Sequence, residues 1–139
     1  MRARPQGRPD PVRYLALDVG DRTIGLAVGE EAFGLARPLR TIRRTGIAED
    51  LDTLRRIVAE EDVGALVIGL PLDARGEIGY QASRVRTFAE SARSLERPIE
   101  LVDERFTTAE AARRGAEDLD AGAAVVLLED FFSARRRRA

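Results

Sequence analysis

Hydrophobic residues change their spacing after the first third of this chain. Three apolar segments with strand character, 12–19, 23–29 and 33–42, follow one another with short links, and Ile47 then begins a stripe at helical spacing. Strands joined by such short links pair as an antiparallel meander. Helices and strands alternate afterwards, in the order βββ-α-β-α-β-α-α. This order predicts an α/β fold with a five-stranded mixed sheet, three antiparallel strands and then two parallel ones, flanked by helices.

Several local signals position the predicted elements. The continuous apolar run 63–70 is typical of a central strand covered on both faces, and Pro38 favours an edge position for the third strand. Thr107 and Glu110 have the spacing of a capping box, which predicts a helix start. The remaining expectations are helices over 47–58, 85–95 and 120–132 and a fifth strand over 99–102.

Composition narrows the class of protein. The 139 residues include no cysteine and no histidine, so disulfides and thiolate or imidazole metal sites are excluded. We expect no membrane segment, because no apolar run approaches the roughly 20 residues that span a bilayer. The start of the chain lacks the apolar stretch of a secretory signal, and together with the missing cysteines this favours a cytoplasmic protein.

The charge is unevenly distributed. All 23 basic residues are arginine, and segment 12–134 holds 16 of them against 23 acidic residues. We predict a basic arm over 1–11, one domain over 12–134 and an arginine-rich tail over 135–139. The tail is either a solvated run of charges or a phosphate contact. An acidic domain binds nucleic acid only through local arginine clusters, its arms or a bound metal.

Acidic residues stand at the borders of three apolar elements. Asp18 ends the first strand, Asp103 and Glu104 follow the fifth, and Asp118 and Asp120 precede the last helix. Each has a plainer alternative: Asp18 as a turn residue, the middle pair as partners of a helix dipole, and Asp120 as an N-cap. Parity at a strand end does not decide within the middle pair.

Helical spacing favours Asp120 over Asp118, because Asp120 shares a helix face with the apolar residues Ala124, Leu127, Leu128 and Phe131. Carboxylates gathered without nitrogen or sulfur ligands indicate a hard cation, Mg²⁺ or Mn²⁺. Two such ions, clamped by shared carboxylates, hydrolyse phosphodiesters. Gly69, before Pro71, is either a point of close approach to phosphate or a structural turn.

Four segments together resemble the YqgF/RuvX family of the ribonuclease-H-like superfamily, whose members are related to Holliday junction resolvases. They are LDVGDRTIGLA at 17–27, VIGLPL at 67–72, VDERFTTAEA at 102–111 and LDAGAAV at 119–125. The resemblance implies a ribonuclease-H-like fold. It also implies that Asp18, Glu104 and Asp120 are catalytic, metal-binding acids.

The resemblance further implies a metal-dependent nuclease with Mg²⁺ or Mn²⁺, in two ions, as cofactor. Its substrate is either the precursor of small-subunit ribosomal RNA or branched junction DNA, and a two-fold symmetric junction favours a homodimer. Expected contacts to nucleic acid are Arg22, Arg75, Arg105, Arg113 and Arg114. Arg22 replaces a lysine that the family often has, and the segment before Asp120 is shorter than in many relatives.

Two other functions compete with the nuclease. One is a noncatalytic ribosome-assembly or DNA-scaffolding factor that binds nucleic acid with the same fold, which the acidic domain and the short segment before Asp120 favour. The other is a phosphate binder of the sugar-kinase and actin type, which needs two such domains around a cleft.

Overall fold

The computed structural model describes residues 12–72, 75–104 and 119–138, and their five strands form one sheet. The strand order is β3-β2-β1-β4-β5. Pairing is antiparallel between β1 and β2 and between β2 and β3, and parallel between β1 and β4 and between β4 and β5. The predicted mixed sheet is confirmed. The strands are β1 Arg13–Val19, β2 Thr23–Glu30, β3 Leu35–Arg43, β4 Ala65–Leu70 and β5 Ile99–Asp103.

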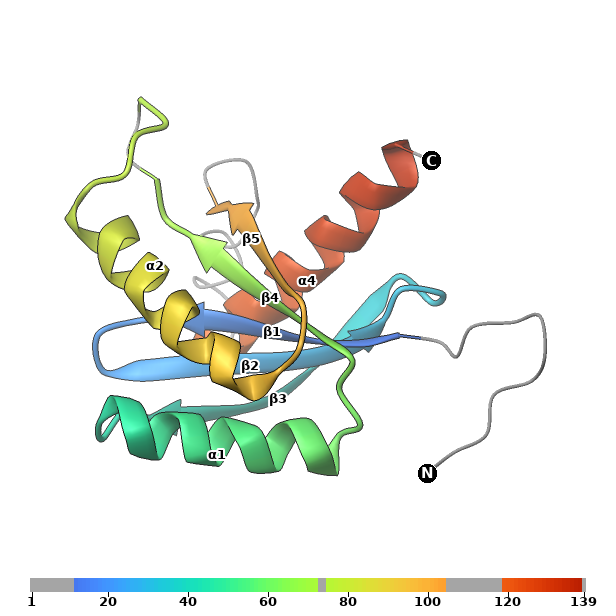
Figure 1. Cartoon of the computed structure of the whole chain (residues 1–139). Coiled ribbons are helices and arrows are strands. Elements are labelled where there is room, and N and C mark those ends of the chain that lie inside the picture. The colour runs from blue at the N-terminus through green and yellow to red at the C-terminus, as the bar shows by residue number, and fades with distance from the viewer. Residues whose placement is uncertain (1–11, 73–74, 105–118, 139) are drawn as a thin grey trace.

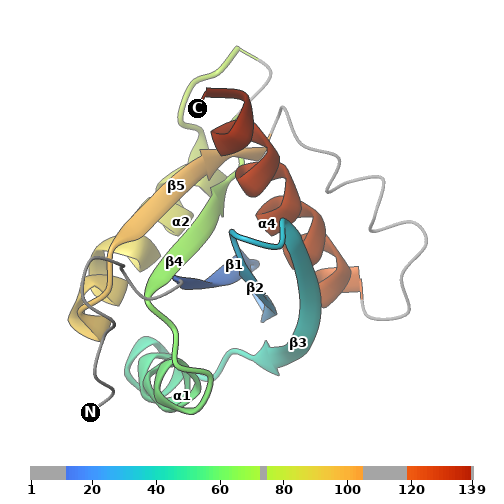
Figure 2. The same cartoon turned by 90° about the vertical axis from the view of Figure 1, so that its right-hand side faces the viewer.

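Helices cover both faces of the sheet. Helices α1 (Ile47–Glu60) and α2 (Tyr80–Ala92), with the short 3-10 turn Arg93–Leu95, lie on one side, and α4 (Leu119–Arg138) lies on the other (Figures 1 and 2). The helix predicted from Thr107 falls outside the described residues. Within the part of the chain that is described, none of the helices combines the length and the apolar character needed to cross a membrane.

Two hydrophobic cores follow from the alternation of side chains along β1. Leu15 and Leu17 belong to the core under α1 and α2, whereas Tyr14 and Ala16 pack under α4. Successive side chains of a strand point to opposite faces. The face that carries Tyr14 and Ala16 is therefore also the face that carries Asp18.

Strand β3 is an edge strand, as Pro38 predicted. Proline lacks the N–H that a central strand would need to donate. The register also shifts here, because Leu26 pairs with Arg40 while Ala27 pairs with Pro38, which leaves Leu39 without an opposite residue. This irregularity has the form of a β-bulge, a common feature of sheet edges.

Helix α4 runs through Arg138, so the prediction that it ends near Phe132 was wrong. The Arg135 Nε donates to Glu31 Oε2 at 2.6 Å, and its guanidinium lies 5.4 Å from the centre of the Phe131 ring. The hydrogen bond to Glu31 raises the pKa of Arg135 above its ordinary value. Cations also stabilise a helix C-terminus through its dipole. Together these effects stabilise Arg135 as part of the helix.

Candidate metal site at the strand ends

The residues beside Asp18 on the two adjacent strands are glycines, which have no side chains. It is half-buried near the end of β1, and its antiparallel partner on β2 is Gly25. On the other side, Leu17 pairs with Ile68 of β4, so the next position in this register sets Asp18 level with Gly69. Two glycines thus flank the carboxylate and leave space beside it on the α4 face.

The carboxylate of Glu104 lies over Gly69. A Cβ atom at position 69 would stand 2.6 Å from Glu104 Cδ and 2.7 Å from its Oε1. This oxygen is buried from solvent. Gly69 pairs with Val102 of β5, so the chain continues past the strand end and Glu104 turns back over β4. Neighbouring strands are about 4.8 Å apart, so the Glu104 carboxylate lies one strand away from Asp18.

The register also separates Glu104 from Asp103. Val102 packs under α4, and Ile99 belongs to the opposite core. Alternation from Ile99 assigns Asp103 to the α1–α2 face, and it assigns Glu104 to the α4 face with Asp18. The structure therefore brings Asp18 and Glu104 together and directs Asp103 away from them.

Asp120 is the second residue of α4, and its side chain lies outside the described part of the structure. The direction of the helix is clear, because the rings of Phe131 and Phe132 lie 5.3 and 5.5 Å from that of Tyr14 at the start of β1. The first turn of α4 therefore points toward the end of β1 that carries Asp18. The predicted docking face of α4 is confirmed, since Ala124, Leu127, Leu128 and Phe131 are buried.

The donor chemistry of this edge fits a hard divalent cation. Asp18 and Glu104 offer carboxylate oxygens, the ligands that Mg²⁺ and Mn²⁺ prefer. The Glu104 carboxylate occupies the space over Gly69 that a Cβ atom would otherwise fill. Among the described side chains, no group of three metal-ligating residues occurs. A three-acid set would thus need Asp120, whose side chain is not among them.

Arg44 fixes the turn that follows Asp18, a role that was not predicted from the sequence. Its Nη1 donates to the Gly20 carbonyl at 2.9 Å, and its backbone N–H donates to the Arg22 carbonyl at 2.8 Å. Its Nε donates to Asp50 Oδ2 at 3.3 Å. The guanidinium also lies 5.2 Å from the Phe88 ring centre. One side chain thus joins the β1–β2 turn to α1 and α2.

Asp50 is the buried counterpart of Arg44 and was also missed. It is 2 % exposed, and its Oδ1 accepts a hydrogen bond from the Thr45 backbone N–H at 3.0 Å. The available signal was helical spacing: Asp50 precedes Leu54 by one turn and Ile57 by two, on the buried face of α1. An acid in that position predicts a buried ion pair.

The arginines predicted to contact nucleic acid are only partly described. Arg22 is exposed in the β1–β2 turn, next to the edge that carries Asp18. Arg75 is exposed in the segment between β4 and α2. Arg105, Arg113 and Arg114 lie outside the described residues.

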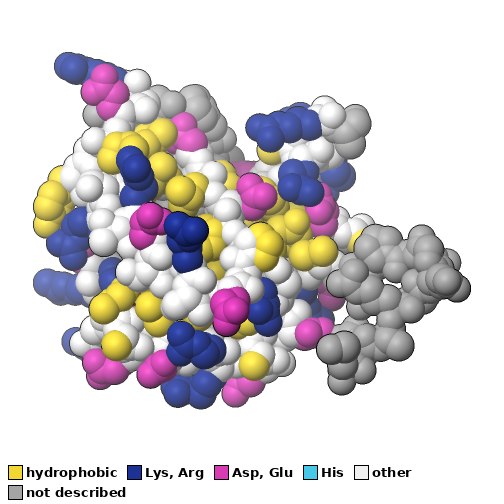
Figure 3. Space-filling view, viewed as in Figure 1, with side chains coloured by type: hydrophobic (Ala, Val, Ile, Leu, Met, Phe, Trp, Pro, Cys, Tyr) yellow, Lys and Arg dark blue, Asp and Glu magenta, His cyan; other side chains and the backbone are white. Residues whose placement is uncertain are grey.

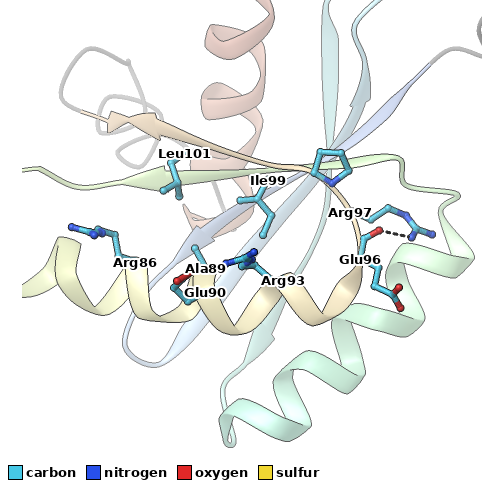
Figure 4. A pocket seen from close by; sticks show the side chains of 9 residues that line it. Arg86, Ala89, Glu90, Arg93, Glu96, Arg97, Ile99 and Leu101 are labelled. Carbon is cyan, nitrogen blue, oxygen red and sulfur yellow. Dashed lines mark hydrogen bonds and ion pairs between the residues drawn. The ribbon is translucent and has the colours of Figure 1, made fainter.

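A hollow of about 660 Å³ lies between α2 and β5, away from the acids (Figure 4). Leu101 and Ile99 line it from the strand, and Arg86 and Arg93 line it from the helix side. Ile99 belongs to the core on the α1–α2 face, so this hollow and the Asp18–Glu104 pair occupy opposite faces of the sheet. The candidate metal site therefore lies on the other face of the sheet and not in this hollow.

Comparison with known proteins identifies the family and the fold separately. The sequence profile of the family described as "RuvX: Holliday junction resolvase" matches residues 12–134. A relative from Thermus thermophilus is 42% identical over 132 residues, covering 88% of this chain and 98% of its own. A Roseiflexus relative is 40% identical over 139 residues, covering 91% and 98%. Both carry the name "Putative pre-16S rRNA nuclease".

Among solved structures, the fold resembles that of Thermus thermophilus RuvC in complex with a Holliday junction substrate. The TM-score is 0.57 at 14% identity, over 90% of this chain and 96% of the other. Identity this low supports the fold alone. The predicted ribonuclease-H-like architecture is confirmed by this likeness.

Proposed function

Because the chain belongs to the RuvX family of Holliday junction resolvases, we propose that it is a divalent-metal-dependent nuclease acting on structured nucleic acid. The observation that carries the proposal is the Glu104 carboxylate over Gly69, one strand from Asp18 and on the same face. Two carboxylates on one sheet face offer the oxygen ligands that suit a bound divalent cation.

We assign Asp18, Glu104 and Asp120 as the residues that would hold Mg²⁺ or Mn²⁺, in two ions. When bound, such ions activate water and stabilise the leaving oxygen of a phosphodiester. The protein's own contribution is to hold the carboxylates close together. Gly69 provides the space for Glu104, and Arg44 holds the turn after Asp18 through the Gly20 carbonyl.

The precursor of small-subunit ribosomal RNA is the first substrate we propose. Relatives that are 40% and 42% identical over almost their whole length are named for that RNA. Branched junction DNA is the second candidate, favoured by the description of the family. Both are structured nucleic acids, so the same two-ion chemistry serves either one.

The test is cleavage of both substrates in Mg²⁺ and in Mn²⁺ by the wild-type protein and by three variants. We expect cleavage of one substrate by wild type, and its loss in Asp18→Asn and Glu104→Gln. Asp103→Asn is the matched control, because this neighbouring acid belongs to the other face of the sheet, and it should retain activity. Binding without cleavage by the wild type would support the noncatalytic factor instead.

Two further expectations belong to this proposal. A homodimer would suit a two-fold symmetric junction, and sedimentation with and without junction DNA measures it. A cytoplasmic location remains a prediction from the missing cysteines, which localisation of a tagged protein tests.

A further inference from the structure

Tyr80 exposes an aromatic ring at the start of α2. It is 75% exposed, so one face of an aromatic ring is available to a ligand. Its ring is nevertheless held in place: Arg84 Nη1 donates to Tyr80 Oη at 2.8 Å, and the Arg84 guanidinium lies 5.5 Å from the ring centre. The hydrogen bond to Tyr80 also raises the pKa of Arg84 above its ordinary value. The exposed ring is thus fixed by a neighbouring cation.

Arg84 connects this ring to the catalytic edge. Its Nε lies 3.3 Å from Asp21 Oδ1, and Asp21 stands in the β1–β2 turn, three positions after Asp18. Figure 1 shows that this turn and the start of α2 lie at the same end of the molecule. The ring is therefore positioned relative to the end of β1, but on the α1–α2 side of the sheet.

A groove of about 440 Å³ adjoins Tyr80 between α1 and α2. Ser83, Thr87 and Ser91 follow one another at helical spacing along its α2 side, and Ile47, which is 44% exposed, provides apolar surface. Hydroxyl groups of this kind contact phosphate and sugar oxygens, and aromatic faces stack on bases. The groove thus combines a stacking surface with polar groups beside it.

Charge alone would not hold nucleic acid on this face. Figure 3 shows basic and acidic side chains interspersed over the side that carries α1 and α2. Arg84 itself is paired with Asp21. Affinity here must come mainly from stacking, which needs a base whose face is accessible. In a duplex both faces of an internal base are covered, so the chemistry favours an unpaired nucleotide.

We propose that Tyr80, Arg84 and the hydroxyl-lined groove bind an unpaired nucleotide of the substrate, with its base stacked on the Tyr80 ring. The inference rests on the proposed nuclease function for its substrate class. The substrate would then have a single-stranded segment next to the cleavage site, and this segment would lie on the opposite side of the sheet from the acids. The site would accept any base, since every base has a face for stacking.

Binding of a fluorescent single-stranded oligonucleotide, measured by anisotropy without divalent metal, tests the inference. Tyr80→Ala should weaken binding about 5- to 150-fold, the range for losing one base–aromatic stack, whereas Tyr80→Phe should stay within about twofold of wild type. Phe33→Ala is the matched control, because Phe33 is 72% exposed in the β2–β3 turn, at the other end of the sheet. It should bind like wild type.

Two readouts separate stacking from a general loss of surface. The ratio of wild-type to Tyr80→Ala affinity should persist as salt rises, since stacking is not screened as phosphate contacts are. The chain has two tyrosines and no tryptophan, and Tyr14 is buried. Tyrosine emission should therefore be quenched on titration with oligothymidylate in wild type, and far less in Tyr80→Phe, which retains only Tyr14.

Several results would overturn the inference: equal binding by wild type and Tyr80→Ala, an equal loss in Phe33→Ala, or an equal loss on a blunt duplex without unpaired ends. The two proposals fail in distinguishable ways. A protein that cleaves nothing but binds single strands through Tyr80 contradicts the nuclease assignment and supports the groove. A protein that cleaves normally after Tyr80→Ala, with unchanged binding, contradicts the groove alone.

Discussion

Replacing Gly69 with alanine should inactivate the protein without unfolding it. The new Cβ would stand 2.6 Å from Glu104 Cδ and 2.8 Å from its Cγ. Carbon atoms in contact are normally about 3.5–4.0 Å apart. The Glu104 side chain must therefore retreat by roughly 1 Å or adopt another rotamer. Since Gly69 lies level with Asp18 on the adjacent strand, the displaced carboxylate moves out of the shared site.

The expected magnitudes differ for activity and stability. A displacement of roughly 1 Å in a catalytic arrangement costs about 100-fold in rate. An off-rotamer side chain costs about 0.5–1.5 kcal/mol. Alanine in place of a glycine with an ordinary backbone conformation contributes about 0.4–1 kcal/mol in the opposite direction. The free energy of unfolding should therefore stay within about 1 kcal/mol of wild type.

The assay is single-turnover cleavage in Mn²⁺ together with urea unfolding of the same preparations. Gly79→Ala is the matched control, because a Cβ at that glycine meets nothing within 4 Å. A second comparison uses Glu104→Ala, in which the clash is absent. If the new Cβ strains the protein only through Glu104, adding Gly69→Ala to Glu104→Ala should cause no further fall in the free energy of unfolding.

Cleavage by Gly69→Ala at nearly the wild-type rate would refute this prediction. Such a result would mean that the position of the Glu104 carboxylate over β4 is not required for the chemistry. Loss of both activity and several kcal/mol of stability would identify Gly69 as a structural glycine, and the drop in rate would then report unfolding.

Three further predictions concern other parts of the chain. Arg44→Ala leaves Asp50 buried without its cation and should lower the free energy of unfolding by about 3 kcal/mol, measured in urea, whereas the charge-conserving Arg44→Lys should lower it less. Asp18→Asn should abolish cleavage but leave metal-free thermal stability unchanged or raised, because it relieves repulsion with the neighbouring carboxylate; a lower melting temperature would contradict the metal-site assignment. Changing the exposed arginines 136–138 to glutamine should reduce the slope of log affinity against log salt concentration for nucleic-acid binding. The reduction should be up to about 0.7–0.9 for each phosphate that these arginines neutralise. An unchanged slope would exclude them from the interface.

The strand order and the face of the sheet that carries Asp18 could be predicted from local patterns. The change of hydrophobic period after residue 43 separates the meander from the later parallel strands, and Pro38 marks the edge. Alternation along β1 assigns Asp18 to one face. These signals depend only on neighbouring residues and on the handedness of the crossover, so they can be read without tertiary contacts.

Relations that depend on packing between distant segments could not be predicted. Gly69 was interpreted as a turn or an approach to phosphate, but its missing side chain accommodates Glu104, which lies 35 positions away in the sequence. The arginine run resembled a solvated tail, yet Arg135 packs against Glu31 and Phe131. Tyr80 shows no periodicity that distinguishes a fixed exposed ring from a core residue. For Gly69 and for Arg135 the deciding partners, Glu104 and Glu31, are brought near only by the fold, whereas Arg84 lies one helical turn from Tyr80.

The β1–β2 turn connects the two proposed sites. Arg44, just before α1, donates a hydrogen bond to the Gly20 carbonyl of this turn, and Arg84 of α2 forms an ion pair with the Asp21 carboxylate. Asp18 stands just before the turn, on the α4 side of the sheet, while Tyr80 lies on the α2 side. A nucleic-acid strand whose base stacks on Tyr80 must therefore pass the end of β1 to reach the carboxylates of Asp18 and Glu104. In this arrangement the short turn that positions Asp18 also determines where an unpaired segment of nucleic acid crosses the edge of the sheet. The stacking site on one face and the hydrolytic site on the other therefore both depend on the conformation of this turn.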